Sequence, residues 1–319
     1  MKIEVWIIFI ILVIIIVIGI FWWLSYWIIF YPSRNMVWDP SKDGYKYDDL
    51  YIPRDYHETG LAYYGRYSGH KTVINIWHFR NLEKNRRGHE PATVLFFHGN
   101  TGNISHRQYI VEICHRFGLN LVLVDCRGYG RSDGDVCPDG MYQDGETAYH
   151  YLKSQIPANQ IIVWGESLGG TVACYVASKY KCKGLILMAT FSSLEDIIVG
   201  SGFSRWQAIT MSKMIRWIFH PMESKVYIKN IKCPVAIIHS KYDTLIPYTC
   251  SKIMYDSIPH QNKMLFTIEG DHSSPEFSDQ VLKGILAFIG VQGECLNDDI
   301  KYMTEKLKAV CQEHSDLNP

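Results

Sequence analysis

Residues 161–180 read IIVWGESLGGTVACYVASKY and carry the clearest fold signal in this chain of 319 residues. The apolar run at 161–164 is typical of a buried strand, and the residues from Leu168 onward have helical character. Between them, residues 165–169 have the form G-x-S-x-G, a sharp strand-to-helix turn that lifts a serine hydroxyl clear of the backbone. A side chain at Gly165 or Gly169 would collide with the neighbouring strand or helix, which explains both glycines.

Similar apolar runs occur on both sides of this turn, and most are separated by segments that can be helical. We predict strands at 72–79 (TVINIWHF), 93–97 (TVLFF), 119–124 (LNLVLV), 161–164 (IIVW), 184–188 (GLILM), 235–239 (VAIIH) and 264–268 (MLFTI). Strands of nearly continuous apolar character joined by helices indicate an α/β fold with a mostly parallel sheet covered on both faces.

Three residues follow the ends of three of these strands and together suggest nucleophilic catalysis. Ser167 follows the strand at 161–164, Asp243 follows the strand at 235–239, and His272 follows the strand at 264–268. The carboxyl ends of parallel strands meet at one edge of a sheet, so these residues are expected to converge. Serine needs a base to accept its proton. We therefore predict Ser167 as nucleophile, His272 as base and Asp243 as acid.

Other carboxylates compete for the acid position. Asp271 is adjacent to His272, and an adjacent residue cannot easily reach the Nδ1 atom of the imidazole ring. Glu195 and Asp196 follow the strand at 184–188 and are the better rivals.

An oxyanion hole is expected from two backbone N–H groups. The loop after the strand at 93–97 reads HGNTGN over residues 98–103, and Gly99 allows the backbone to approach a substrate closely. The N–H of Asn100 is the first candidate and Thr101 the second, paired with the N–H of Leu168 at a helix N-terminus. His98 is expected to hold this loop in place.

A second glycine-rich loop, DCRGYGRSDG at residues 125–134, follows the strand at 119–124. It should flank the site, with Arg127 and Asp133 acting as braces. Asn103-Ile104-Ser105 has the form of a glycosylation sequon. Beside the oxyanion loop, Asn103 is expected to be too buried for modification.

Taken together, HGNTGN, DCRGYGRSDG, GESLGG, SKYDTLIP and GDH resemble the abhydrolase-domain (α/β-hydrolase) serine hydrolases with an N-terminal membrane span. The Bem46-like group, neighbours of the protein depalmitoylases, is the most similar, over about residues 72–290. The resemblance implies a triad at Ser167, Asp243 and His272, an ester, thioester or amide substrate that is often lipidic, and no metal. Depalmitoylases are usually held to membranes by acylated cysteines, whereas this chain carries an apolar helix, which weakens the thioesterase interpretation.

Residues 5–30 (VWIIFIILVIIIVIGIFWWLSYWIIF) contain no charged side chain. About 20 apolar residues suffice to cross a bilayer, and the tryptophans near residue 30 are typical of its interface. A cleaved signal peptide would be shorter and would end in small residues. We predict a retained single-pass anchor in the lipid bilayer. Flanking lysines and arginines favour a cytosolic domain only slightly, so the side of the membrane and the organelle stay open.

Four segments are predicted: an anchor at 1–31, an irregular linker at 32–70, the catalytic domain at 71–291 and a polar tail at 292–319. The stretch at 192–232 is too long for a simple crossover. It forms either a lid over the carboxyl edge of the sheet or one long amphipathic helix packed on the domain. If it is a lid, six apolar side chains would line an acyl path from the bilayer and favour long acyl chains: Trp206, Ile209, Met211, Met214, Trp217 and Phe219.

Composition narrows the function classes. The 32 basic and 32 acidic residues balance, with no basic stripe to suggest a nucleic acid partner. Nine scattered cysteines form no metal-type cluster, and their odd number mildly favours a reducing environment. Neither a cofactor nor a metal is expected, and the oligomeric state is not encoded.

The sequence therefore predicts a membrane-anchored serine hydrolase that cleaves an ester or thioester of a small-molecule or acylated substrate. The alternatives are a non-catalytic scaffold of the same fold and an amidase similar to serine aminopeptidases.

Overall fold

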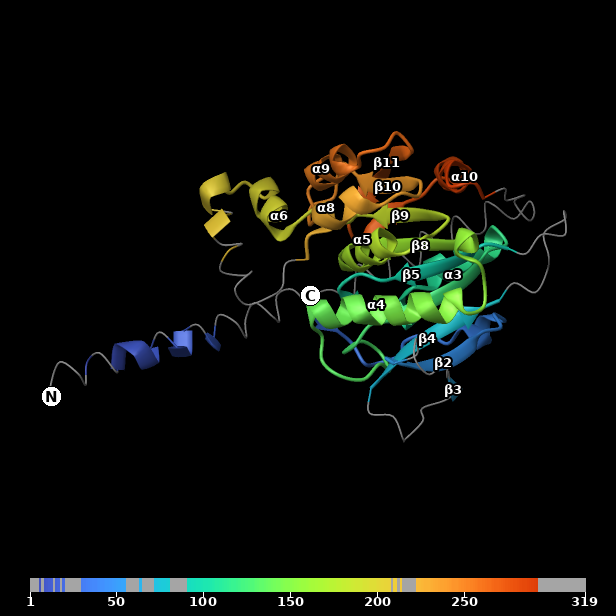
Figure 1. Cartoon of the computed structure of the whole chain (residues 1–319), viewed down its shortest axis with the longest axis horizontal. Helices are drawn as coiled ribbons and strands as arrows, with labels where there is room; N and C mark the ends of the chain where they lie inside the picture. Colours follow the sequence, from blue (N-terminus) through green and yellow to red (C-terminus); the bar gives the residue numbers. More distant parts are fainter. Residues whose placement is uncertain are drawn as a thin grey trace.

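A sheet of ten strands forms the centre of the molecule (Figure 1), in the order β12-β11-β10-β9-β8-β5-β7-β4-β2-β3. The strands from β7 to β11 across the middle of this order pair in parallel, whereas β4 is antiparallel to β7 and β2 is antiparallel to β4. The computed structural model describes residues 6, 9–13, 15–17, 19–20, 30–55, 63–64, 72–80, 91–207, 209–210, 213 and 222–291.

The strands of the large sheet are β2 (Asp48–Pro53), β3 (Tyr63–Tyr64), β4 (Val73–Phe79), β5 (Thr93–Phe97), β7 (Asn120–Asp125), β8 (Ile161–Glu166), β9 (Gly184–Met188), β10 (Val235–Ser240), β11 (Lys263–Asp271) and β12 (Ser274–Glu276). A small parallel pair joins β1 (Tyr31–Pro32) to β6 (Thr101–Gly102). Each predicted strand is confirmed to within three residues at either end. The predicted parallel sheet is confirmed as well.

Helices cover both faces of the sheet (Figure 1). They are α3 (Gln108–Arg116), α4 (Pro138–Lys153), α5 (Leu168–Lys179), α6 (Leu194–Gly200), α8 (Ser224–Tyr227), α9 (Thr249–Ser257) and α10 (Asp279–Phe288), with short 3-10 turns η1 (Pro40–Asp43), η2 (Ile104–His106), η3 (Ala158–Gln160) and η4 (Ile228–Asn230). Side chains of α4 and α5 pack in one apolar cluster, and those of α3 and α10 pack in a second. The sheet therefore separates two cores.

The segment predicted as an irregular linker is more ordered than expected. Residues 48–53 form β2, which pairs along its whole length with β4, and its residues from Leu50 onward are buried. The aspartates, tyrosine and proline of this strand are residue types that also suit a turn-rich loop, so the sequence alone does not indicate a strand here.

The insertion between β9 and β10 is not one long helix in its described part. Helix α6 begins at the N-cap Ser193 and ends at Gly200, and a turn follows in which Gly202 adopts a positive φ of 94°. Trp206 is exposed and Ile209 is half-buried. Met211, Met214, Trp217 and Phe219 lie outside the described residues, as does the predicted tail at 292–319.

The predicted anchor falls largely on residues that the structure does not describe. Within the part that it does describe, no helix has both the length and the apolar character needed to cross a membrane. Phe30, predicted as the last residue of the membrane-spanning stretch 5–30, is instead 1% exposed and packs in the core cluster that also contains α4 and α5 side chains. The apolar stretch available for an anchor is therefore residues 5–29.

Candidate active site

Ser167 occupies a strained turn between β8 and α5. Its φ of 49° lies in the left-handed region, which a serine rarely adopts unless the surroundings impose it. A Cβ atom added at Gly165 would overlap Gly170 of α5, and one added at Gly169 would overlap the backbone carbonyls of Phe97 and His98. The predicted reason for the two glycines is confirmed, because only residues without a side chain let helix, turn and strand pack this closely.

The three predicted triad residues lie in one hydrogen-bonded row. His272 Nε2 is 3.1 Å from Ser167 Oγ, and His272 Nδ1 is 2.7 Å from Asp243 Oδ2. Ser167 and Asp243 are nearly buried, so these contacts lie in a region of low dielectric. The row has the order nucleophile, base, acid that transfers a proton from a serine hydroxyl.

Four N–H groups surround the Asp243 carboxylate. Its Oδ1 atom accepts from the backbone of Leu245 at 3.0 Å and of Ile246 at 2.7 Å, and its Oδ2 atom accepts from His272 and from His239 Nε2 at 3.1 Å. Burial opposes ionisation of this carboxyl, but the donors from His239, His272 and Ile246 outweigh it and hold the pKa of Asp243 well below its usual range. Asp243 therefore stays ionised and can orient the imidazole ring.

The rival carboxylates serve other groups. Asp271 accepts from the backbone N–H groups of Thr244 at 2.9 Å and of His272 at 2.7 Å. Asp196 pairs with Lys225 at 2.9 Å and accepts from the hydroxyl of Ser193, the N-cap of α6, at 2.6 Å. Among these acidic residues, Asp243 is the one that contacts the His272 imidazole.

The loop after β5 lies directly against Ser167. A Cβ atom added at Gly99 would stand 3.5 Å from the Ser167 Cβ atom, so this backbone lies close to the Ser167 side chain. The Asn100 carbonyl accepts from Tyr129 Oη at 3.1 Å, which turns this loop toward the glycine-rich loop at 125–134. Leu168 is the first residue of α5, and its N–H lies at the positive end of that helix.

Glu166 ties the oxyanion loop to the nucleophile turn. Its Oε2 atom accepts from Arg107 Nε at 2.8 Å and from the Gly99 N–H at 3.3 Å, and Arg107 also donates to the Thr101 carbonyl at 2.9 Å. Burial disfavours the charge on Glu166, but the Arg107 guanidinium and the Gly99 N–H hold its pKa below the ordinary value. An ionised carboxylate thus fixes the loop that faces Ser167.

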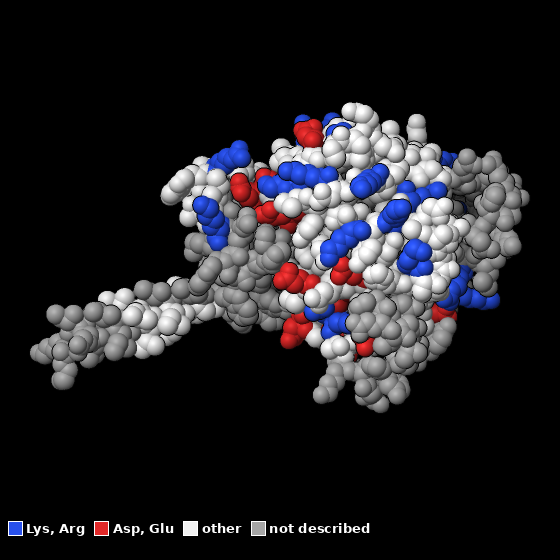
Figure 2. All heavy atoms as spheres, in the orientation of Figure 1, with Lys and Arg blue, Asp and Glu red and all other residues white. Residues whose placement is uncertain are grey.

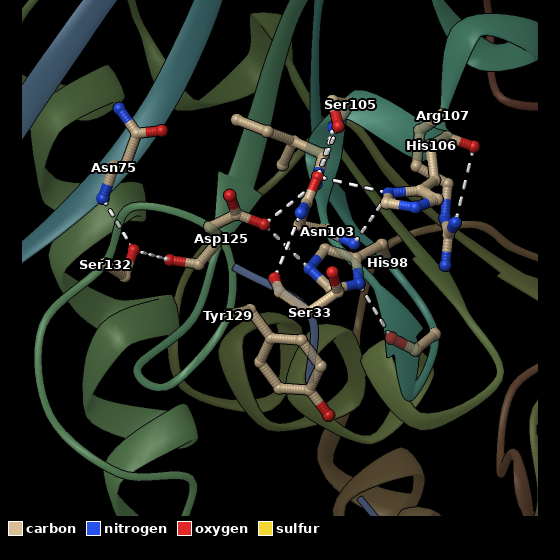
Figure 3. A network of polar contacts seen from close by, with 12 residues as sticks. Ser33, Asn75, His98, Asn103, Ser105, His106, Arg107, Asp125, Tyr129 and Ser132 are labelled. Carbon is tan, nitrogen blue, oxygen red and sulfur yellow. Dashed lines mark hydrogen bonds and ion pairs between the residues drawn. The ribbon is translucent and has the colours of Figure 1, made fainter. Parts of the chain in front are cut away.

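A buried polar network supports the same loop from behind (Figure 3). His98 Nδ1 lies 2.7 Å from the Gly99 carbonyl, and His98 Nε2 lies 3.1 Å from Asp125 Oδ1, which also accepts from the Ile104 N–H at 2.9 Å. His98 is therefore structural, as predicted. Asn103 is fully buried, which confirms that its sequon is inaccessible in the folded domain.

The braces of the second glycine-rich loop are also confirmed. Arg127 binds the buried carboxylate of Asp144 through Nε at 3.0 Å and through a terminal nitrogen at 2.8 Å. Arg54 binds the same carboxylate at 3.0 Å and donates to the Asp133 carbonyl at 2.6 Å. Within the described residues, no group of three or more His, Cys, Asp and Glu side chains is placed to hold a metal ion.

Two features of the site were missed in the sequence. His239 is the last apolar-strand residue before the Asp243 loop, and its contact with the acid could have been suspected from its place at the end of β10. Residues 30–37 lie against the oxyanion loop, and nothing in their composition signals this contact.

Known proteins resemble this chain at the level of fold and family description. Residues 88–229 match the family described as serine aminopeptidase, S33. Protein bem46 of Schizosaccharomyces pombe is 32% identical over 160 residues, which cover 49% of this chain and 52% of that protein. The lysophosphatidylserine lipase ABHD12 of Danio rerio is 28% identical over 198 residues, which cover 57% of this chain and 51% of that protein. The chain thus spans about half the length of these two relatives.

Among solved structures, an esterase of Pyrococcus furiosus superimposes with a TM-score of 0.61 and 19% identity, covering 82% of this chain and 96% of the esterase. The strand order, the nucleophile turn and these similarities agree on the fold: the chain has the α/β-hydrolase fold, and hydrolases with esterase and lipase activity are among its relatives.

Proposed function

We propose that this protein is a membrane-anchored serine hydrolase that cleaves carboxylic esters or thioesters. The observation that carries the proposal is the row Ser167–His272–Asp243, with contacts of 3.1 and 2.7 Å. A serine, a histidine and a buried carboxylate in this order are the parts that acyl transfer to water requires.

The proposed reaction runs in two halves. His272 takes the proton of Ser167 Oγ as that oxygen attacks the substrate carbonyl carbon, and Asp243 stabilises the imidazolium that forms. His272 then gives the proton to the leaving alcohol or thiol, and the acyl group stays on Ser167. A water molecule, deprotonated by His272, attacks the acyl-enzyme, and Ser167 regains the proton when the acid leaves.

The negative oxygen of each tetrahedral intermediate needs donors that are already in place. We assign the backbone N–H groups of Asn100 and Leu168 to this role. The close approach of Gly99 to Ser167 and the start of α5 at Leu168 support the assignment.

The substrate class rests on relatives and on the site. The esterase of known structure and the ABHD12 lipase have names that point to oxygen esters. The family description points to amide cleavage, and an amidase is the second candidate for that reason. A non-catalytic scaffold fits less well, because such a protein has no need for a buried, fully bonded Asp243 beside His272.

We propose that residues 5–29 form the membrane-spanning helix. Twenty-five residues without a charged side chain support it, and about 20 suffice to cross the hydrocarbon core. The side of the membrane on which the domain lies is left open.

A panel of p-nitrophenyl esters, acyl thioesters and amino-acid amides tests the proposed function on the full chain in detergent. Ester or thioester turnover that falls at least about 10³-fold in His272→Ala is expected. His115→Ala, an exposed position on α3, is the matched control and should retain turnover. Turnover of amides alone would favour the second candidate, and absence of turnover across the panel would favour the scaffold.

A further inference from the structure

Residues 30–37, which follow directly on the apolar stretch, are docked on the oxyanion loop. Tyr31–Pro32 pairs in parallel with Thr101–Gly102. The Tyr31 N–H donates to the Asn100 carbonyl at 3.2 Å, and the Ser33 N–H donates to the Gly102 carbonyl at 3.1 Å. With Phe30 buried in the core, the chain has no slack between the apolar stretch and the domain.

Buried polar groups hold this segment from its other side (Figure 3). The Ser33 carbonyl accepts from the Gly130 N–H at 2.9 Å and from Asn103 Nδ2 at 3.0 Å, and Asn103 Nδ2 also donates to the Asn35 carbonyl at 2.8 Å. Arg34 donates to the Ser132 carbonyl at 2.9 Å. The segment is therefore bonded to both loops that flank the nucleophile, 98–103 and 125–134.

The place of these bonds decides where the apolar stretch leaves the domain. Asn100, which binds Tyr31, is next to Gly99, which lies against Ser167. The loop at 98–103 follows the carboxyl end of β5, the same edge of the sheet from which Ser167, Asp243 and His272 arise. Tyr31, two residues after the proposed span, consequently lies at the edge of the domain that carries Ser167.

Exposed apolar side chains belong to the same edge. Tyr31 comes from the docked segment, Phe203 and Trp206 from the insertion after β9, and Tyr242 and Leu245 from the loop after β10; their exposed fractions run from 48% to 74%. The insertion and the Asp243 loop touch, because a Cβ atom at Gly200 would overlap Pro247. Figure 1 shows the region of α6 projecting from one side of the domain.

Basic side chains accompany this apolar surface. Arg205 and Lys213 are exposed on the insertion, and Lys241 is exposed beside Tyr242. Figure 2 shows Lys and Arg side chains on the projection that Figure 1 assigns to residues around α6. Aromatic and aliphatic side chains mixed with cations are typical of surfaces that rest at the headgroup level of a bilayer.

We infer that residues 30–37 are a strap that holds the Ser167 edge of the domain against the bilayer surface. This inference rests on the proposed span at residues 5–29. The predicted linker at 32–70 thus begins with a segment that is bonded to the domain. An acyl group that leaves the bilayer then reaches Ser167 without crossing bulk water.

Depth measurements in proteoliposomes of phosphatidylcholine test the strap without depending on catalysis. A fluorophore is attached to Phe203→Cys or to Asn159→Cys, in full chains with Cys137, Cys295 and Cys311 replaced by serine. Asn159 is exposed and precedes β8, at the opposite edge of the sheet. Lipids carrying a quencher should reduce the emission of the label at 203 at least about threefold more than that of the label at 159.

A linker variant separates the strap from simple tethering. Inserting about 30 Gly/Ser residues between Ile29 and Phe30 leaves the strap bonds in place but adds a flexible reach of about 30 Å. The ratio of quenching at position 203 to quenching at position 159 should then fall toward one. Turnover of an ester lipid embedded in the vesicles should fall at least about fivefold, while turnover of a soluble short ester stays unchanged.

Equal quenching at positions 203 and 159 in the chain without the linker would overturn the inference, and so would a linker variant that behaves like the parent. Release of the parent chain from vesicles by alkaline carbonate would overturn the proposed span and the strap with it. Loss of all ester turnover with the quenching difference intact would refute the proposed hydrolase and leave the strap supported.

Discussion

His239 Nε2 lies 3.1 Å from Oδ2 of Asp243, the same oxygen that accepts the Nδ1–H of His272. The Ile246 carbonyl is 2.9 Å from His239 Nε2, and a carbonyl can only accept, so this nitrogen carries a proton. On the other side of the ring, His239 Nδ1 is close to Ser251 Oγ. A second, fully buried imidazole thus bonds the same carboxylate oxygen of Asp243 as His272 does.

His239 is expected to act as a positioning residue. His239→Leu should lower kcat for a soluble ester about tenfold, since the Asp243 carboxylate loses one of its donors, while KM changes little. The remaining bond to His272 strengthens, so the acidic limb of the kcat/KM profile should move to higher pH. His239→Gln keeps an N–H near the same place and should recover most of the loss. A Leu variant with an unchanged profile and kcat would show that His239 only fills space.

Asp243 should also make stability depend on acid. Its pKa is held below the unfolded value, so the stabilisation that it supplies is complete above about pH 5 and is lost as the pH falls through the folded pKa. The difference in unfolding free energy between the wild type and Asp243→Asn should therefore shrink as the pH drops from about 5 toward 3. Urea unfolding of the full chain in detergent at a series of pH values measures it. A constant difference over this range would contradict the assigned ionisation.

The nucleophile turn should not tolerate a methyl group. Gly169→Ala places its Cβ atom on the carbonyls of Phe97 and His98, two backbone groups that cannot move without breaking β5. Ester turnover should fall at least about 100-fold. Gly284→Ala, where the nearest atom is Phe266 Cε1 at 3.4 Å, is the control and should retain activity. Equal activity of the two variants would mean that the turn is less tightly packed than described.

Arg107 should stabilise the loop at 98–103 through its bonds to Glu166 and to the Thr101 carbonyl. Arg107→Ala leaves the Glu166 carboxylate without its main partner and frees the Thr101 carbonyl, so the unfolding free energy should fall by about 2 kcal/mol. The double variant Arg107→Ala, Glu166→Gln should regain part of it, because the unpaired charge is gone. Thermal unfolding of the single and double variants checks this, and a double variant that is less stable than Arg107→Ala would refute the pairing.

The convergence of Ser167, His272 and Asp243 could be predicted from the sequence because each residue follows a strand of regular apolar character. The order of β5, β8, β10 and β11 puts their carboxyl ends side by side, so position in the chain determines position in space. The need for glycine at 165 and 169 could also be predicted, because a side chain at either position would collide with the adjacent strand or helix.

Other features of the structure could not be predicted from the sequence, because they depend on contacts between segments that are distant in the chain. The bond from Asn103 to the Ser33 carbonyl joins residues 70 positions apart, and neither residue type signals a partner. Phe30 was assigned to the apolar stretch because a phenylalanine side chain suits a protein core and a lipid bilayer equally well. In the structure it is buried in the protein core. The strand β2 was not predicted, because its polar and aromatic residues also suit a loop.

Covalent labelling of Ser167 tests the central claim most directly. The full chain is treated with a fluorophosphonate, which reacts with activated serines, and the modified peptide is located by mass spectrometry. One adduct on Ser167 is expected. It should be absent in Ser167→Ala, form much more slowly in His272→Ala, and be unchanged in Ser178→Ala, a control at a serine near the end of α5. Undiminished labelling of Ser167→Ala, or no labelling of the folded wild type, would contradict the claim.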